Sequence, residues 1–68
     1  MTRLMINGVE AELPVATITE LLAERGIDPN ARFLAVAVNG NVVRRADWPA
    51  AALAPGDNVE IVRPFQGG

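Results

Sequence analysis

The chain has 68 residues, of which 50% are hydrophobic and 21% are charged, and its formal net charge is −2. A chain of this length forms one small domain and buries only about 60% of the surface of its unfolded state. Because it contains no cysteine and no histidine, disulfides, iron–sulfur ligation and most zinc sites are excluded, and its core must be stabilised by packing alone.

The missing residue types also limit catalysis. The sequence has no Cys, His, Ser, Lys or Tyr, so the common nucleophiles and the bases that activate them are absent. Eight carboxylates remain, but a glycosidase with paired carboxylates needs a substrate cleft for which so short a chain lacks room. We therefore expect a protein that is not an enzyme.

Charge and hydropathy argue against nucleic-acid and membrane partners. Six arginines are outnumbered by eight acidic residues, and Trp48, Phe33 and Phe65 do not form an aromatic platform interleaved with arginine. The longest apolar run, "FLAVAV", is too short to cross a bilayer, and the N-terminus lacks the apolar segment of a signal peptide. We expect a cytoplasmic domain.

The first element in the chain, "RLMINGVEAEL" at 3–13, predicts a β-hairpin. Asn7-Gly8 supplies a type I′ turn, which requires positive φ, and Pro14 ends the second strand because it lacks an N–H donor. The alternation places Leu4 and Ile6 on one side of the hairpin. On the other side it places Val9, Ala11 and Leu13.

A helix is predicted over "TITELLAERG", residues 17–26. Thr17 and Glu20 have the spacing of a capping box, and Gly26 suits the left-handed position after the last turn. The apolar face, which includes the stem of Arg25, consists of Ile18, Leu21 and Leu22, with Ile27 closing an apolar contact beyond the helix.

The segment "RFLAVAVNGNVV" predicts a third strand followed by a second Asn-Gly turn at Asn39-Gly40. Its alternation directs Leu34, Val36 and Val38 one way, and Phe33, Ala35 and Ala37 the other. Residues 44–53, "RRADWPAAAL", form either a short turn of helix or a loop, with Trp48 as a core residue. Arg44 and Arg45 lie on a solvated face, with contact to acidic residues of a partner as the alternative. The last strand is "NVEIV", with Val59 and Ile61 toward the core, and Pro64 ends it.

The order hairpin, helix, hairpin-like pair and final strand indicates an α+β fold of the β-grasp type, a mixed sheet with one helix packed on one face. In this arrangement the last strand inserts beside the first. We expect a β-grasp domain at 1–63 and a flexible C-terminal tail at 64–68 that leaves a central strand and ends in Gly-Gly.

The terminal "RPFQGG" suggests that the end of the chain is chemically important. A terminal carboxylate is ionised and unreactive toward nucleophiles at neutral pH, so acyl chemistry requires activation, for example as an acyl-adenylate in another protein's site. Residues 63–68 reach at most roughly 20 Å when extended at ~3.3–3.6 Å per residue. Because glycine lacks a Cβ, Gly67 and Gly68 suit passage through a narrow channel.

Three segments, "FLAVAVNGNVVRRADW", "LAPGDNVEIV" and the terminal "QGG", resemble the ThiS family of thiamine-biosynthesis sulfur carriers. The resemblance covers nearly the whole chain. Arg44 stands where relatives often carry a proline, and Pro64-Phe65 is a variant of the short apolar pair that precedes Gln-Gly-Gly in the family.

The resemblance implies a ubiquitin-like β-grasp fold and a carrier without a cofactor of its own. It also implies that a ThiF-like, E1-like adenylyltransferase adenylates Gly68 with ATP and Mg²⁺. Sulfur from a cysteine desulfurase relay then displaces AMP and leaves a thiocarboxylate, from which a ThiG-like thiazole synthase takes the sulfur. The absence of cysteine is compatible with sulfur carried on the carboxyl carbon.

On this interpretation Gly68 carries the adenylate and then the sulfur. Gly67, which has no side chain, keeps the chain narrow where it enters the partner's active site. Gln66 and Phe65 seat the tail in the partner, although Phe65 folding over its own sheet remains an equal alternative. A docking surface on the sheet face away from the helix would consist of Met5, Phe33, Ala35, Ala37 and Val62. The alternative is that a loop covers that face.

Three other functions remain open. The small subunit of molybdopterin synthase has the same fold and chemistry but usually a longer chain. A ubiquitin-like protein modifier would join Gly68 to a target lysine. An RNA-binding β-grasp module would not need the tail, and the acidic balance of the chain disfavours it.

Overall fold

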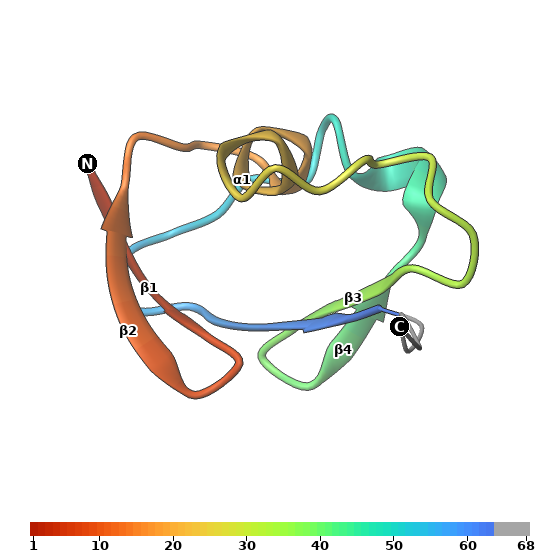
Figure 1. Ribbon diagram of the computed structural model, residues 1–68. Helices are drawn as coiled ribbons and strands as arrows, with labels where there is room; N and C mark the ends of the chain where they lie inside the picture. Colours follow the sequence, from red (N-terminus) through yellow and green to blue (C-terminus); the bar gives the residue numbers. More distant parts are fainter. Residues whose placement is uncertain (64–68) are drawn as a thin grey trace, which may run out of the picture.

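A computed structural model of the protein describes residues 1–63 (Figure 1). Its elements are β1 (Thr2–Ile6), β2 (Val9–Leu13), α1 (Ile18–Glu24), β3 (Ala35–Val38), β4 (Asn41–Val43), the short 3-10 helix η1 (Arg45–Asp47) and β5 (Asn58–Val62). The five strands form one sheet in the order β2-β1-β5-β3-β4, and α1 lies across one face of it (Figure 1). β5 runs parallel to β1 and antiparallel to β3, so the last strand is inserted beside the first, as the β-grasp prediction requires.

The hairpin register corrects one prediction. Ile6 pairs with Val9 and Leu4 pairs with Ala11, and directly paired residues project to the same face of a sheet. The apolar residues of β1 and β2 therefore share the helix-facing side and do not lie on opposite sides. The cause is the two-residue turn, in which Asn7 and Gly8 have φ of 50° and 82° and which brings the two alternations into phase.

Helix α1 has the predicted caps. Thr17 is extended, with φ of −132°, and its hydroxyl accepts from the Glu20 N–H at 3.2 Å. The Glu20 carboxylate reaches back and accepts from the Ala16 N–H at 2.8 Å. At the other end, the N–H groups of Gly26 and Ile27 donate to the Ala23 and Leu22 carbonyls at 3.0 and 2.8 Å, the Schellman pattern of a helix C-terminus.

The third strand begins at Ala35 and not at Phe33, which corrects the predicted extent. Phe33 has a φ of 63°, so its backbone is left-handed and cannot continue a strand, and its side chain is 78% exposed. Phe33 therefore belongs to the connection between α1 and β3, and the alternation of Ala35 and Ala37 does not extend to it.

Trp48 and Arg45 fix the connection after β4. Trp48 is 2% exposed, as predicted for a core residue, and its indole N–H donates to the Val43 carbonyl at 2.8 Å. Arg45 is not merely part of a solvated face. Its guanidinium donates to the carbonyls of Pro29 and Ala31 and stacks over the Trp48 ring at 5.0 Å from its centroid.

The core lies between α1 and the sheet. Within residues 1–63 every buried side chain is apolar, and no buried side-chain polar atom lacks a hydrogen-bond partner. The buried residues are Leu4, Ile6, Val15, Ile18, Leu21, Leu22, Ile27, Leu34, Val36, Trp48, Leu53, Val59 and Ile61. In this part of the chain, no helix has the length and apolar character needed to span a membrane.

Candidate functional site

The predicted sulfur-carrying residue, Gly68, and the tail residues Gly67, Gln66 and Phe65 lie outside the described residues. The structure shows where their attachment point is held. Arg63, the last described residue, directly follows β5. Since β5 lies between β1 and β3, the chain reaches residue 64 from a strand that is paired on both sides.

Strand β5 is paired with β3 from Val59 to Val62 and with β1 at its first two residues. All four residues of β3 pair with it, from Val38↔Val59 to Ala35↔Val62. On the β1 side the pairs are Met5↔Asn58 and Ile6↔Val59. The inward side chains of β5, Val59 and Ile61, are buried under the helix. These pairings fix the strand that precedes the tail.

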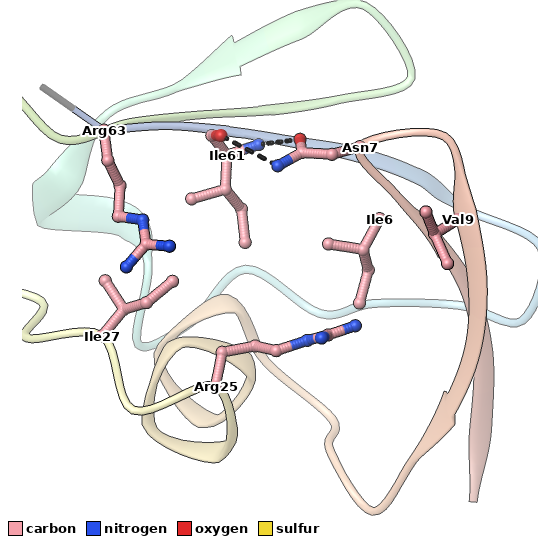
Figure 2. A pocket seen from close by; sticks show the side chains of 7 residues that line it. All are labelled: Ile6, Asn7, Val9, Arg25, Ile27, Ile61 and Arg63. Atoms are coloured by element: carbon pink, nitrogen blue, oxygen red, sulfur yellow. Dashed lines mark hydrogen bonds between the residues drawn. The ribbon is translucent and has the colours of Figure 1, made fainter. Parts of the chain in front are cut away.

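Where β1 ends, the side chain of Asn7 makes the hydrogen bonds to β5 that a further residue of β1 would otherwise make. The Asn7 amide accepts from the Ile61 N–H at 2.8 Å and donates to the Ile61 carbonyl at 3.1 Å, across 54 residues of sequence (Figure 2). One amide therefore satisfies both backbone groups of Ile61 that β1 leaves unpaired. The sequence predicts Asn7 only as a turn residue, so its role in supporting β5 is a finding of the tertiary structure.

The second Asn-Gly turn supports the start of the same strand. The side-chain Oδ1 of Asn39 accepts from the Asn58 N–H at 2.9 Å, and its side-chain Nδ2 donates to the Asp57 carboxylate at 3.0 Å. Asp57 also accepts from the Ala54 N–H at 2.8 Å, which closes the Pro-Gly turn before β5. Both hairpin tips thus contribute an asparagine side chain to the final strand.

The sheet face away from α1, the outer face, carries four of the five predicted docking residues. Ala35 pairs with Val62, so these two side chains are neighbours on that face, and Ala37 lies two residues further along β3. Met5 is also on the outer face, but it pairs with Glu10 and Asn58 and is therefore surrounded by polar residues. The predicted apolar surface is thus centred on β3 and the end of β5.

One residue of this surface was missed. Val42 pairs directly with Ala37 and is 77% exposed, so it extends the apolar surface onto β4. The alternation of "NVV" after the second Asn-Gly turn is the sequence signal that would have identified it. We call the contiguous set the outer-face patch; it consists of Ala35, Ala37, Val42 and Val62.

A hollow of about 290 Å³ opens on the opposite, helix-facing side of β5. We call it the arginine pocket. Arg25, the C-cap of α1, and Arg63 direct their guanidinium groups into it from opposite sides, beside apolar side chains of the sheet and of the segment after the helix (Figure 2). Its lining residues are Ile6, Asn7, Val9, Arg25, Ile27, Ile61 and Arg63. Alternation along β5 predicts the side on which Arg63 lies, but the approach of Arg25 depends on how the helix packs.

The described residues next to the tail carry few ionic interactions of their own. Among residues 1–63, no group of three His, Cys, Asp or Glu side chains is placed to hold a metal ion. The same region contains one salt bridge, between the exposed side chains of Arg3 and Glu10 at 3.2 Å. The features next to the tail are the outer-face patch on one side of β5 and the arginine pocket on the other.

Comparison with known proteins gives concordant results. A crystal structure of a thiamine biosynthesis protein (ThiS) from Geobacter metallireducens is 30% identical and superposes with a TM-score of 0.78, covering 98% of this chain and 100% of that one. A solution structure of a thiamine biosynthesis protein from the same organism gives the same identity and TM-score and is covered over 88% of its length. No curated protein matches the sequence. The model of the ThiS family matches residues 4–68. The chain belongs to the ThiS family.

Proposed function

We propose that the chain is the sulfur carrier for formation of the thiazole ring in thiamine biosynthesis, and that Gly68 bears the sulfur. The observation that carries this proposal is the match to the ThiS family over residues 4–68, which includes Gly67 and Gly68. Two solved structures similar to this chain are of a thiamine biosynthesis protein from one organism. The support of β5 on both sides is consistent with a domain that presents its C-terminus to other proteins.

The proposed chemistry takes place in the active sites of partners. A ThiF-like adenylyltransferase, using ATP and Mg²⁺, joins the Gly68 carboxylate to AMP and releases pyrophosphate. This step makes the carboxyl carbon electrophilic, which an ionised carboxylate is not. A sulfur nucleophile from a cysteine desulfurase relay then attacks that carbon. The bond to AMP breaks, which leaves an acyl disulfide when the nucleophile is a persulfide. A thiol then reduces the S–S bond and is itself oxidised to a disulfide, so that sulfur occupies the place of one carboxyl oxygen.

The product is a thiocarboxylate, which a ThiG-like thiazole synthase uses as its sulfur source. In this scheme the domain is a carrier and not a catalyst, and it needs no cofactor of its own. Gly67 and Gly68 allow a close approach because they lack Cβ atoms. Gln66 and Phe65 are the residues that we assign to recognition of the tail.

We assign docking to the outer-face patch. Val62 is 59% exposed and is the outward residue nearest to the tail. An activating enzyme that takes the tail into its active site must pass close to this residue. Phe33 is a second exposed apolar side chain near the same end of β5, since it lies two residues before Ala35, which pairs with Val62.

The test is intact-mass spectrometry of the purified chain after incubation with ATP, Mg²⁺, a ThiF-like enzyme and a sulfur donor. We expect a gain in mass equal to the exchange of one oxygen for sulfur, localised to Gly68 by fragmentation. A chain that lacks Gly68 serves as the control and should show no gain. The ThiF-like enzyme must first be shown to modify its own carrier in this assay. The proposal would be refuted if that enzyme left the full-length chain unmodified.

The identity of the final acceptor needs a separate experiment. The thiocarboxylate form is mixed with a thiazole synthase or with the large subunit of molybdopterin synthase, and loss of sulfur from Gly68 is followed by mass. We expect sulfur transfer with the thiazole synthase. Transfer only with the molybdopterin enzyme, or branched Gly-Gly remnants on cellular lysines, would assign the chain to another pathway.

A further inference from the structure

The arginine pocket combines two positive charges with an apolar floor. Arg25 projects from the C-terminal end of α1 and Arg63 from the end of β5, and both guanidinium groups point into the same hollow (Figure 2). The floor is formed by side chains that are already buried, among them Ile6, Ile27 and Ile61. A group that enters this pocket therefore meets cations at its rim and aliphatic carbon below.

Within residues 1–63, neither guanidinium has a partner. No hydrogen bond or salt bridge in the described region involves the side chain of Arg25 or Arg63, and no carboxylate lines the pocket. Among the other arginines, Arg3 pairs with Glu10, and Arg45 binds two carbonyls and stacks on Trp48. Arg32 lies over the Phe33 ring, and Arg44, like the two pocket arginines, has no side-chain hydrogen bond or salt bridge in the described region. In a chain of net charge −2, the pocket is a local concentration of positive charge.

The chemistry of the pocket selects its occupant. A guanidinium presents paired N–H donors that match the two oxygens of a carboxylate. The apolar floor suits the aliphatic stem of the side chain that bears the carboxylate, or an apolar neighbour. The volume of about 290 Å³ lies at the small end of ligand pockets and suits one or two side chains.

We propose that the arginine pocket receives an acidic side chain, flanked by aliphatic carbon, from the protein that activates the C-terminus. This inference rests on the proposed function. The position of the pocket supports it, because Arg63 is the last residue before the tail and Val62 of the outer-face patch is its neighbour on the opposite face. A partner that binds the tail then contacts both faces at the end of β5, directly before residue 64.

The first test is the kinetics of adenylation by a ThiF-like enzyme, with R25Q, R63Q and the double variant as substrates. Glutamine removes the charge and retains polarity and much of the length. We expect KM to rise about threefold to fivefold for each single variant, as for partly exposed ion pairs, and about tenfold or more for the double variant, with kcat unchanged. R44Q is the matched control, because Arg44 is exposed and lies outside the pocket, and its KM should change less than about twofold.

A double variant with the KM of R44Q, or with a lower kcat at unchanged KM, would overturn the pocket proposal while leaving the carrier function intact. A wild-type chain that is never adenylated would instead refute the proposed function. These two failures are therefore distinguishable. Thermal unfolding of each variant by circular dichroism confirms that the compared chains are folded.

The second test needs no partner. Hexanoate, which joins a carboxylate to an aliphatic chain, is titrated into the labelled protein, and the side-chain Nε–H signals of its arginines are followed by NMR. We expect the Arg25 and Arg63 signals to shift in a saturable way, and Arg44 to remain unchanged. Hexanol and acetate each lack one half of the recognised chemistry and should produce smaller shifts. Equal shifts with hexanol, or no selectivity for the two pocket arginines, would refute the assigned chemistry.

Discussion

Replacement of Arg45 by alanine tests whether one exposed arginine holds the connection between α1 and β3. The Arg45 guanidinium donates to the carbonyls of Pro29 and Ala31 and covers one face of Trp48. Arg44, the preceding residue, is exposed and has no side-chain hydrogen bond or salt bridge within residues 1–63. R45A and R44A therefore remove the same side chain from adjacent positions, of which only one has these contacts.

The magnitude follows from the contacts that are lost. A hydrogen bond from a charged donor contributes about 1.5–3 kcal/mol when sheltered, and we take about 1 kcal/mol for each of these because Arg45 is exposed. The stacking on Trp48 adds about 0.5–1 kcal/mol at an exposed site. R45A should therefore lower the free energy of unfolding by about 2.5–3 kcal/mol, which for a domain of this size corresponds to about 10–24 °C in Tm.

The assay is thermal and urea unfolding followed by far-ultraviolet circular dichroism. R44A should lie within about 0.5 kcal/mol of the parent chain, as surface substitutions generally do. R45K should be intermediate, because an ammonium lacks the planar fork that reaches two carbonyls at once. If R45A and R44A unfold within about 0.5 kcal/mol of each other, the two carbonyl contacts and the stacking contribute nothing, and the reasoning is refuted.

Three further predictions concern β5 and its surroundings. N7G keeps the left-handed backbone but leaves the Ile61 N–H and carbonyl without the amide, so it should cost about 1–3 kcal/mol in urea unfolding. N39G, whose lost bonds are exposed, should cost less, and an equal cost would contradict the assigned role of Asn7. F33N should raise the free energy of unfolding by about 1 kcal/mol, because asparagine tolerates the φ of 63° that strains phenylalanine. F33A keeps that strain, and an equal gain there would refute this explanation. V62D should raise the KM for the activating enzyme about tenfold with little change in Tm, whereas N58D, at the other end of β5 on the same face, should have no such effect on KM.

Much of the fold follows from short-range signals in the sequence. Two Asn-Gly pairs predict both hairpin turns, and Thr17, Glu20 and Gly26 predict the ends of the helix; the structure confirms each of them. These signals are local, because a positive φ or a capping bond depends on residues within a few positions of one another. The inserted position of β5 was also predicted, from the order of the elements.

Of the predictions that proved wrong, the hairpin faces depended on a local turn and the extent of the third strand on longer-range contacts. The two-residue turn at Asn7-Gly8 sets how β1 and β2 pair and therefore which of their residues share a face. The start of the third strand depends on Phe33, which has a left-handed backbone and lies in a connection whose carbonyls bind Arg45. Alternation in one strand fixes which residues share a side, but not which partner the strand takes or where its pairing stops.

For the candidate site, the sequence by itself determined the family motifs, the C-terminal Gly-Gly and the presence of an apolar outer surface. Only the tertiary structure decided that Val42 joins this surface, that Asn7 supports Ile61, and that Arg25 and Arg63 face one hollow. The physical reason is distance along the chain. A turn or a cap is stabilised by neighbouring residues, whereas Asn7 and Ile61 are 54 residues apart and meet only because packing of the core places β5 beside β1.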